Sequence, residues 1–283
     1  MVRQSVPEVT GLFMDVDLLK RHFAHIGARV QVRSDGGPSR QMAREGGVTL
    51  DVVQDRYGEL FDVRIMPLAE PRIEVLQTVP NQRHLLLLTQ ADDAAEKNKF
   101  LCGHDERHWF VAAVPGRSVA TVRLAMEALK PPGVVDREAQ VGLSARRRNR
   151  RKNEAFRRQG EWFFVPVIGL KVDPKLVLHN EPVARSGSKA HWLDFAYRSG
   201  GETVYVLDRY PSGLIERQYR EVLARNPKAR AWLWRTMRRN PALYAKGRVR
   251  HPDHATIVLH DWHQVLMNRE SEAPAMRHVA FLD

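Results

Sequence analysis

Residues 251–268, HPDHATIVLHDWHQVLMN, contain the side chains of this chain that could most readily carry out chemistry. Four of the 12 histidines lie in this stretch, together with two aspartates. Imidazole exchanges a proton near neutral pH and binds transition metals, and a carboxylate can support either role. The residue types therefore define a candidate catalytic centre, made of His251, Asp253, His254 and Asn268.

The order of these side chains resembles that of the ββα-metal nucleases. Asp253 and His254, then Asn268, then His278 follow the aspartate–histidine, asparagine, histidine order of that family. The resemblance implies that a histidine activates water while a divalent metal stabilises the leaving oxygen. It therefore implies a metal-dependent nuclease or phosphodiesterase. The chain departs from the family at RHVAFLD, where a strand pattern stands in place of the family's helix.

Strand periodicity gives the same stretch a second interpretation. ATIVL and WHQVL flank His260 and Asp261, which predicts a hairpin with a tight two-residue turn there. In that register His254 faces Met267 and shares a face with His263, roughly 13 Å away at the usual rise per residue. Metal–nitrogen bonds are about 2 Å long, so one ion could not bind both histidines. Because Asn-Gly is preferred in such turns, a wider loop with another register stays open.

A second group of possible metal ligands lies in CGHDERHWF. Cys102, His104 and His108 are all residue types that bind zinc, which makes them candidate metal ligands. The alternative is a polar hairpin tip, because HDER has the composition of a turn between two strands. The sequence leaves the cofactor unknown, with a divalent metal as the candidate.

The charge of the chain is concentrated in two stretches. Lys and Arg number 45 against 33 Asp and Glu, a net charge of +12. Residues 146–158 carry eight basic groups and one acid, and residues 225–250 carry nine basic groups and no acid. The rest of the chain is net acidic. Two concentrated basic stretches on an acidic body favour a surface that binds a polyanion.

Nucleic acid is the polyanion that this pattern favours, because each phosphate contact from Lys or Arg releases a condensed counterion. Trp232, Trp234 and Tyr244 lie in the second stretch and could stack on unpaired bases, or they could be core anchors of a helix. The alternative interpretations of the basic stretches are a solvated linker and a contact with an acidic protein partner. The candidate contact residues are Arg146, Arg147, Arg148, Arg150, Arg151, Lys152, Arg157, Arg158, Arg230, Trp234, Arg235, Arg238, Arg239, Lys246, Arg248 and Arg250.

Composition indicates an ordinary globular protein. The chain has 283 residues, 43% of them hydrophobic and 28% charged, which suits one or two domains. Its longest apolar runs are far shorter than the roughly 18 residues that a membrane span needs, and no signal peptide is expected at the start. A single cysteine excludes an internal disulfide and suits the cytoplasm. We therefore expect a soluble, cytoplasmic protein with no membrane partner.

The elements that must position these residues alternate between strands and helices. We expect helices in the segment 15–30 with its end at Gly27, over 118–130 with Ser118 as the N-cap, over 214–225 and over 231–239. Short, closely spaced strands are expected at 48–54, 60–66, 72–79, 84–90, 99–103 and 108–114 in the first half, and at 161–167, 175–182, 202–208, 247–251, 255–260, 262–268 and 277–283 in the second. Close spacing favours antiparallel pairing.

The pattern predicts the α+β class, with strand-rich antiparallel sheets, packed helices, and two halves joined by a basic helical connector. The expected domains are a strand-rich α+β domain over 1–130, the connector over 131–160, and an α+β domain over 161–283 that ends in a β-hairpin. The favoured function is RNA or DNA binding without strong sequence preference. The metal-dependent nuclease and a scaffold subunit of a protein complex are the alternatives, so whether the chain is an enzyme stays open.

Overall fold

The computed structural model describes residues 15–34, 47–66, 71–91, 96–185 and 188–276. Contacts divide the chain into two compact units. Unit 1 is Met1–Trp162 with Pro252–Ala255 and Met267–Asp283, and unit 2 is Phe163–His251 with Thr256–Leu266. Strand-rich sheets and packed helices confirm the α+β class. No helix in the described ranges is long and apolar enough to cross a membrane.

Unit 1 begins with α1 (Val16–His25), which confirms the first predicted helix. The Asp15 carboxylate accepts hydrogen bonds from two backbone N–H groups of the first turn, and Gly27, with a φ of 78°, lets the chain leave the helix. A three-stranded sheet follows, in the order β1-β3-β2. Its strands are β1 (Val30–Arg33), β2 (Val48–Asp55) and β3 (Gly58–Ile65). The pair β1–β3 is parallel, an exception to the expected antiparallel pairing.

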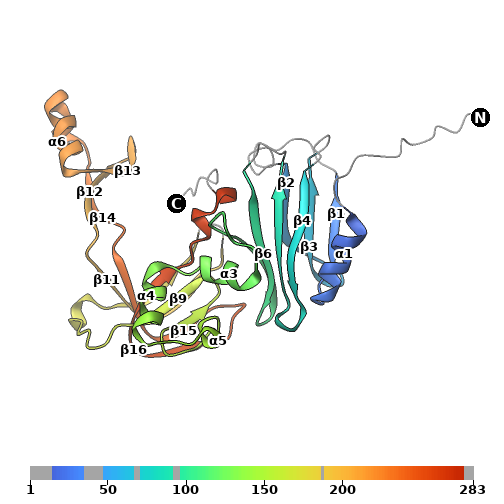
Figure 1. Cartoon of the computed structure of the whole chain (residues 1–283). Coiled ribbons are helices and arrows are strands. Elements are labelled where there is room, and N and C mark those ends of the chain that lie inside the picture. Colours follow the sequence, from blue (N-terminus) through green and yellow to red (C-terminus); the bar gives the residue numbers. More distant parts are fainter. Residues whose placement is uncertain (1–14, 35–46, 67–70, 92–95, 186–187, 277–283) are drawn as a thin grey trace, which may run out of the picture. The chain divides into compact units, whose positions relative to one another are not determined.

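A four-stranded antiparallel sheet forms the centre of unit 1 (Figure 1). Its strands, in order, are β4 (Arg72–Val79), β5 (His84–Gln90), β6 (Asn98–Asp105) and β7 (His108–Ala113), with η1 (Pro80–Gln82) before β5. Leu85 and Leu87 pack in a core with Phe23 and Phe61, whereas Leu86 packs on the other face. Both faces of β5 are therefore buried, which explains its continuous apolar run.

The helices after β7 differ in part from the prediction. α3 (Val122–Ala128) is capped by Thr121, whose hydroxyl accepts a hydrogen bond from the Leu124 N–H at 3.2 Å, so the prediction of Ser118 as N-cap was wrong. Thr121 is the N-cap because it lies directly before the first helical residue. The chain continues with α4 (Pro132–Gln140), α5 (Ala145–Arg148) and β8 (Arg157–Gln159), and unit 1 ends its described part with η4 (Glu270–Glu272) and η5 (Pro274–Met276). Helix within the arginine run is confined to α5.

Five strands of unit 2 are hydrogen-bonded neighbours in the order β10-β11-β15-β16-β9. They are β9 (Trp162–Pro166), β10 (Leu178–Val183), β11 (His191–Ser199), β15 (Ala242–Arg250) and β16 (Ile257–Met267), with η2 (Pro174–Leu176) before β10. The predicted turn at His260 and Asp261 was wrong, because β16 runs through both residues without a break. Its partner is β15, and the connection between the two strands is residues 251–256.

Residues 202–239 form a small substructure that we call the arm (Figure 1). It comprises β12 (Glu202–Leu207), β13 (Tyr210–Ile215), α6 (Glu216–Arg225), η3 (Pro227–Ala231) and β14 (Arg235–Arg239), with the strands in the order β13-β12-β14. α6 confirms the helix predicted over 214–225. The helix predicted over 231–239 was wrong, because β14 pairs with β12 there. Pairing with a neighbouring strand outweighs local helix propensity.

Gly247 sits where the register of β15 shifts against β16, with a φ of 85°. A Cβ at this position would lie 2.9 Å from the Asp194 side chain and 3.0 Å from that of Phe195. Gly169 has a similar φ of 78° but nothing within 4 Å, which makes it a matched control. Replacing either glycine by alanine would lower the free energy of unfolding by about 1–2 kcal/mol, because φ is positive at both positions.

We expect Gly247→Ala to lower the free energy of unfolding by about 1–3 kcal/mol more than Gly169→Ala, because only Gly247 adds a steric clash. Urea unfolding followed by circular dichroism measures both variants. Equal losses in the two variants would contradict the assignment of close packing at this bulge.

Candidate functional site

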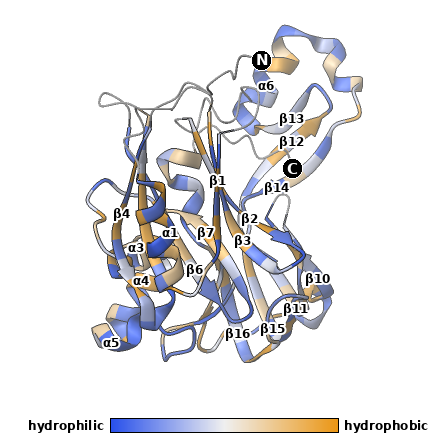
Figure 2. Cartoon of the chain, turned by 90° about the vertical axis from the view of Figure 1, so that its right-hand side faces the viewer, coloured by the Kyte–Doolittle hydropathy of each residue, from blue (hydrophilic) through white to orange (hydrophobic). Residues whose placement is uncertain are grey.

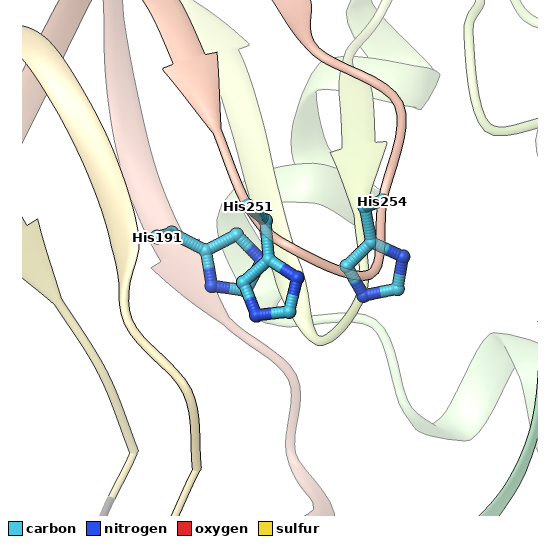
Figure 3. Close-up of side chains that lie close together, drawn as sticks. All are labelled: His191, His251 and His254. Atoms are coloured by element: carbon cyan, nitrogen blue, oxygen red, sulfur yellow. The ribbon is translucent and has the colours of Figure 1, made fainter.

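Two histidines lie side by side at one end of the β11–β15 pair, and a third follows in the chain. His191 is the first residue of β11 and is buried, and His251 directly follows β15. Their rings stack with centroids 4.2 Å apart and planes inclined by 27°. His254 follows three residues later, in the connection to β16. Figure 3 shows the side chains of the three residues. The sequence pointed to His251 and His254 but missed His191.

A backbone carbonyl lies at hydrogen-bonding distance from the ring of His251, whereas the carboxylate near His254 lies farther away. His251 Nε2 lies 3.3 Å from the Lys189 carbonyl oxygen, at hydrogen-bonding distance. His254 Nδ1 lies 3.7 Å from a carboxylate oxygen of Glu106, and the same oxygen accepts a hydrogen bond from the Ala255 N–H at 2.8 Å. A carbonyl or carboxylate on one ring nitrogen fixes the tautomer and turns the other nitrogen outward.

The other two candidate catalytic residues, Asp253 and Asn268, lie in different segments. Asp253 lies between the two histidines in the connection. The Asn268 side-chain oxygen accepts a hydrogen bond from the Glu270 N–H at 3.3 Å, so this side chain stabilises the start of η4. His278 lies outside the described residues. Within unit 2 the structure therefore places His251 beside His191, and it gives Asn268 a local structural contact.

Cys102, His104 and His108 each have other surroundings. Cys102 is fully buried, and burial raises the pKa of its thiol. The His104 ring packs edge-on against Trp109, and its pKa is lowered, first by burial and then by nearby positive charge. His108 Nδ1 lies 2.6 Å from a carboxylate oxygen of Glu59. Within the described ranges, no group of three metal-ligand side chains includes any of these candidates.

Several arginines of the first basic stretch, residues 146–158, form ion pairs with carboxylates. Arg151 forms ion pairs with Asp105 and Glu106 in the turn between β6 and β7, and Arg158 pairs with Asp105 at 3.2 Å. Arg147 pairs with Glu154 within the stretch itself. These guanidinium groups are committed to holding unit 1 together. Among the described residues, the cations of the stretch that are exposed and have no carboxylate at ion-pair distance include Arg146, Arg150 and Lys152.

The second basic stretch is divided between β15 and the arm. On β15, Arg248 and Arg250 pair with Asp194 at 2.9 and 3.4 Å, and the hydrogen bond from Arg248 is the main reason that the Asp194 pKa is lowered. Lys246 is exposed. At the base of the arm, Arg239 pairs with Glu202 at 2.5 Å.

The outer part of the arm carries cations of a different kind. Arg225, Lys228, Arg230 and Arg235 are exposed, and no carboxylate of the described chain lies at ion-pair distance from them. They occupy the end of α6, the turn η3 and the start of β14, within eleven residues of sequence. Figure 2 shows hydrophilic residues along much of α6. The arm therefore presents a concentrated positive surface.

An aromatic cluster supports this surface. Trp234 stacks with Tyr210 at 5.7 Å between ring centroids, meets Tyr219 edge-on at 5.0 Å, and donates a hydrogen bond from Nε1 to the Ala229 carbonyl. Trp234 is thus a packing residue. Trp232 lies at the margin of the cluster, 6.0 Å from Trp234, with the Arg209 guanidinium 5.2 Å from its ring centroid.

No protein-family model matches the chain, and neither a curated protein nor a solved structure was found to be similar to it. The function is therefore argued from the arrangement of side chains alone.

The difference between the ion-paired and the exposed arginines of residues 146–158 can be tested by measuring the free energy of unfolding. We expect Arg151→Gln to lower the free energy of unfolding by about 1.5–3 kcal/mol, because it removes charged hydrogen bonds and leaves Asp105 and Glu106 short of a partner. Arg150→Gln, next to it and exposed, should change stability by less than about 0.5 kcal/mol. Urea unfolding measures both. A loss in Arg150→Gln as large as that in Arg151→Gln would contradict this assignment.

Proposed function

We propose that the protein binds single-stranded RNA or DNA, without strong sequence preference, through the outer part of the arm. The observation that carries the proposal is the set of exposed arm cations without local carboxylate partners, Arg225, Lys228, Arg230 and Arg235. A cation that already pairs with a carboxylate gains little from a phosphate, whereas these four can each replace a counterion.

The aromatic cluster supports a single strand in preference to a duplex. Trp232 is half-buried and lies beside the cations, and the adjoining Leu233 has 88% of its surface exposed. Aromatic rings next to positive charge are a common way of binding unpaired bases, since every base has a face to stack, and we propose that a base displaces the Arg209 guanidinium from the Trp232 ring. The cations then follow the backbone while Trp232 contacts a base.

Unit 1 offers a smaller set of the same kind. Arg146, Arg150 and Lys152 are exposed beside the ion-paired arginines of the first basic stretch. They form a separate surface of unit 1, and the contacts counted below are those of the arm alone. The committed side chains, such as Arg151, Arg158 and Arg248, are left out of the proposed contact surface.

The nuclease hypothesis needs Asp253, His254 and Asn268 at one centre, and the Asn268 side-chain oxygen instead accepts a hydrogen bond from Glu270. Binding without cleavage therefore has the better support. A scaffold role with an acidic protein partner uses the same cations, and the binding experiment separates the two.

Salt dependence tests the proposal. For four phosphate contacts to a single strand, log K should fall with log salt concentration with a slope of about −3, between about 50 and 200 mM salt. Changing Arg225, Lys228, Arg230 and Arg235 together to Gln should remove most of that slope and most of the affinity. Fluorescence anisotropy with a labelled oligonucleotide of about 16 nucleotides measures both quantities.

The matched control removes four exposed cations from unit 1, by changing Lys20, Arg21, Arg107 and Arg123 to Gln. Its net charge equals that of the arm variant, and we expect it to keep the slope. A flat slope in the unaltered protein would remove nucleic acid as the ligand and leave the acidic protein partner. Equal losses in the two variants would show that binding depends on net charge and not on the arm.

Stacking by Trp232 has its own test. We expect Trp232→Ala to weaken binding to single strands by about 5- to 150-fold, because one base–ring contact is worth about 1–3 kcal/mol, and to leave duplex binding unchanged. Leu233→Ala is the control, since it shortens an exposed neighbour that has no ring. An equal loss with single and double strands would contradict stacking, and near-ultraviolet circular dichroism checks that the aromatic cluster is intact.

A further inference from the structure

We propose that a cavity at the base of the arm binds one nucleotide, with its phosphate on Arg238 and its base against Tyr197. All the residues that line this cavity belong to unit 2. Its volume is about 560 Å³, within the roughly 300–1,000 Å³ that is usual for pockets that bind small molecules. The lining includes Leu176, Tyr197, Arg198, Ser199, Arg238 and Pro241.

The chain changes direction twice beside this cavity. Gly200 and Gly201 connect β11 to β12 with φ values of 70° and 76°, and Asn240 connects β14 to β15 with a φ of 51°. A Cβ at Gly201 would lie 2.7 Å from the Arg239 carbonyl oxygen, so the two connections pack backbone against backbone. The position of the cavity is therefore determined by the backbone at the base of the arm.

The charge of the lining favours an anion. Two arginines line the cavity, and no carboxylate is among the lining residues. Arg198 pairs with Glu181 at 2.8 Å, which compensates its charge. Arg238 is exposed, and within the described chain no carboxylate lies at ion-pair distance from it. The cavity therefore has an uncompensated positive charge at Arg238.

Arg238 also has hydrogen-bond donors to offer. Its Nη1 donates a hydrogen bond to the Gly201 carbonyl oxygen at 3.4 Å, which holds the guanidinium at the base of the arm. A guanidinium has five N–H donors in a planar fork, so donors remain for the oxygens of a phosphate. The Ser199 hydroxyl, which is part of the lining, adds a donor for a phosphate or a sugar.

Part of the lining is apolar and includes an aromatic ring. Tyr197 is half-buried, and its ring centroid lies 5.8 Å from that of Tyr244 and 6.3 Å from that of Trp262. These two rings pack against Tyr197 and hold it in place. Leu176, with 56% of its surface exposed, and Pro241 add aliphatic surface. The cavity therefore offers a contact surface for a flat apolar group as well as for an anion.

A nucleotide has both of these parts, since its phosphate binds guanidinium groups and its base stacks on aromatic rings. The choice of a nucleotide among aromatic anions rests on the function proposed for the arm. The nucleotide is either one unit of the bound strand or a free nucleotide, and the experiment distinguishes these two sources.

Isothermal titration calorimetry of the full-length protein with adenosine monophosphate tests the site. We expect one nucleotide per chain, and weaker binding of adenosine and of inorganic phosphate, because each lacks one of the two groups. Arg238→Gln should weaken the binding of adenosine monophosphate by about 10- to 150-fold, the factor that a hydrogen bond to a charged group is worth. Tyr197→Leu should weaken it by about 5- to 150-fold, because the base loses its ring contact.

Lys246→Gln is the matched control. Lys246 is an exposed cation of β15 outside the lining, and its substitution removes the same charge as Arg238→Gln. It should bind adenosine monophosphate like the unaltered protein, and circular dichroism checks that every variant is folded. An equal loss in Lys246→Gln and Arg238→Gln would show an effect of net charge and would overturn the site.

The labelled oligonucleotide of the salt experiment distinguishes the two sources of the nucleotide. If the cavity holds one unit of the bound strand, Arg238→Gln weakens the binding of the oligonucleotide and of adenosine monophosphate by similar factors. If it holds a free nucleotide, Arg238→Gln weakens the binding of adenosine monophosphate alone.

Failure of this site and failure of the proposed function give different results. Absence of saturable binding of adenosine monophosphate, or unchanged affinity in Arg238→Gln, would overturn the site and leave strand binding by the outer arm in place. Inorganic phosphate that binds as tightly as adenosine monophosphate would also overturn it, because the base would then contribute nothing. A flat salt slope with the oligonucleotide, together with nucleotide binding that depends on Arg238, would instead remove the function proposed for the arm and support the site.

Discussion

The hydrogen-bonded pairing of β11 with β15 determines where both candidate sites lie. At one end of the ladder Trp192 pairs with Arg250, which brings His191 beside His251. At the other end Ser199 pairs with Ala242, and the two strands continue into β12 and β14 of the arm. Nine residues of strand span about 30 Å. One ladder thus holds a histidine pair and a positive surface at opposite ends of unit 2.

Pairing with a carboxylate distinguishes the basic residues of this chain from one another better than their number along the sequence does. Both arginine-rich stretches contain residues that pair with carboxylates remote in sequence, such as Arg151 with Asp105 and Arg248 with Asp194. A guanidinium withdrawn from water costs free energy unless it is paired, so Arg151, with 29% of its side chain exposed, is part of the fold. Several exposed cations that have no carboxylate at ion-pair distance among the described residues lie in the arm, and a count of charges along the sequence cannot distinguish them from the paired ones.

The sequence predicted correctly the helices and strands whose burial pattern repeats within the element. Its predictions were wrong where strand pairing or helix capping determines the structure. The stripe of α1 and the apolar run of β5 were confirmed, because each follows from side chains within one element. The turn at His260 was wrong, since polar residues on an exposed strand position resemble a turn. The helix over 231–239 was wrong because β12 supplies a partner for β14. His191 was missed because it lies 60 residues before His251, and strand pairing alone joins them.

The arm is stabilised in large part by packing between aromatic rings. Three short strands and one helix bury little aliphatic surface, and the arm compensates with rings: Tyr205 stacks on Tyr219 at 3.9 Å, and Tyr219 meets Trp234. Trp234 is half-buried and its N–H is satisfied by Ala229. Trp232 lies two residues earlier on extended backbone and is also half-buried, with its ring stacked on Trp234. The packing that stabilises the arm therefore also orients the ring that we assign to the ligand.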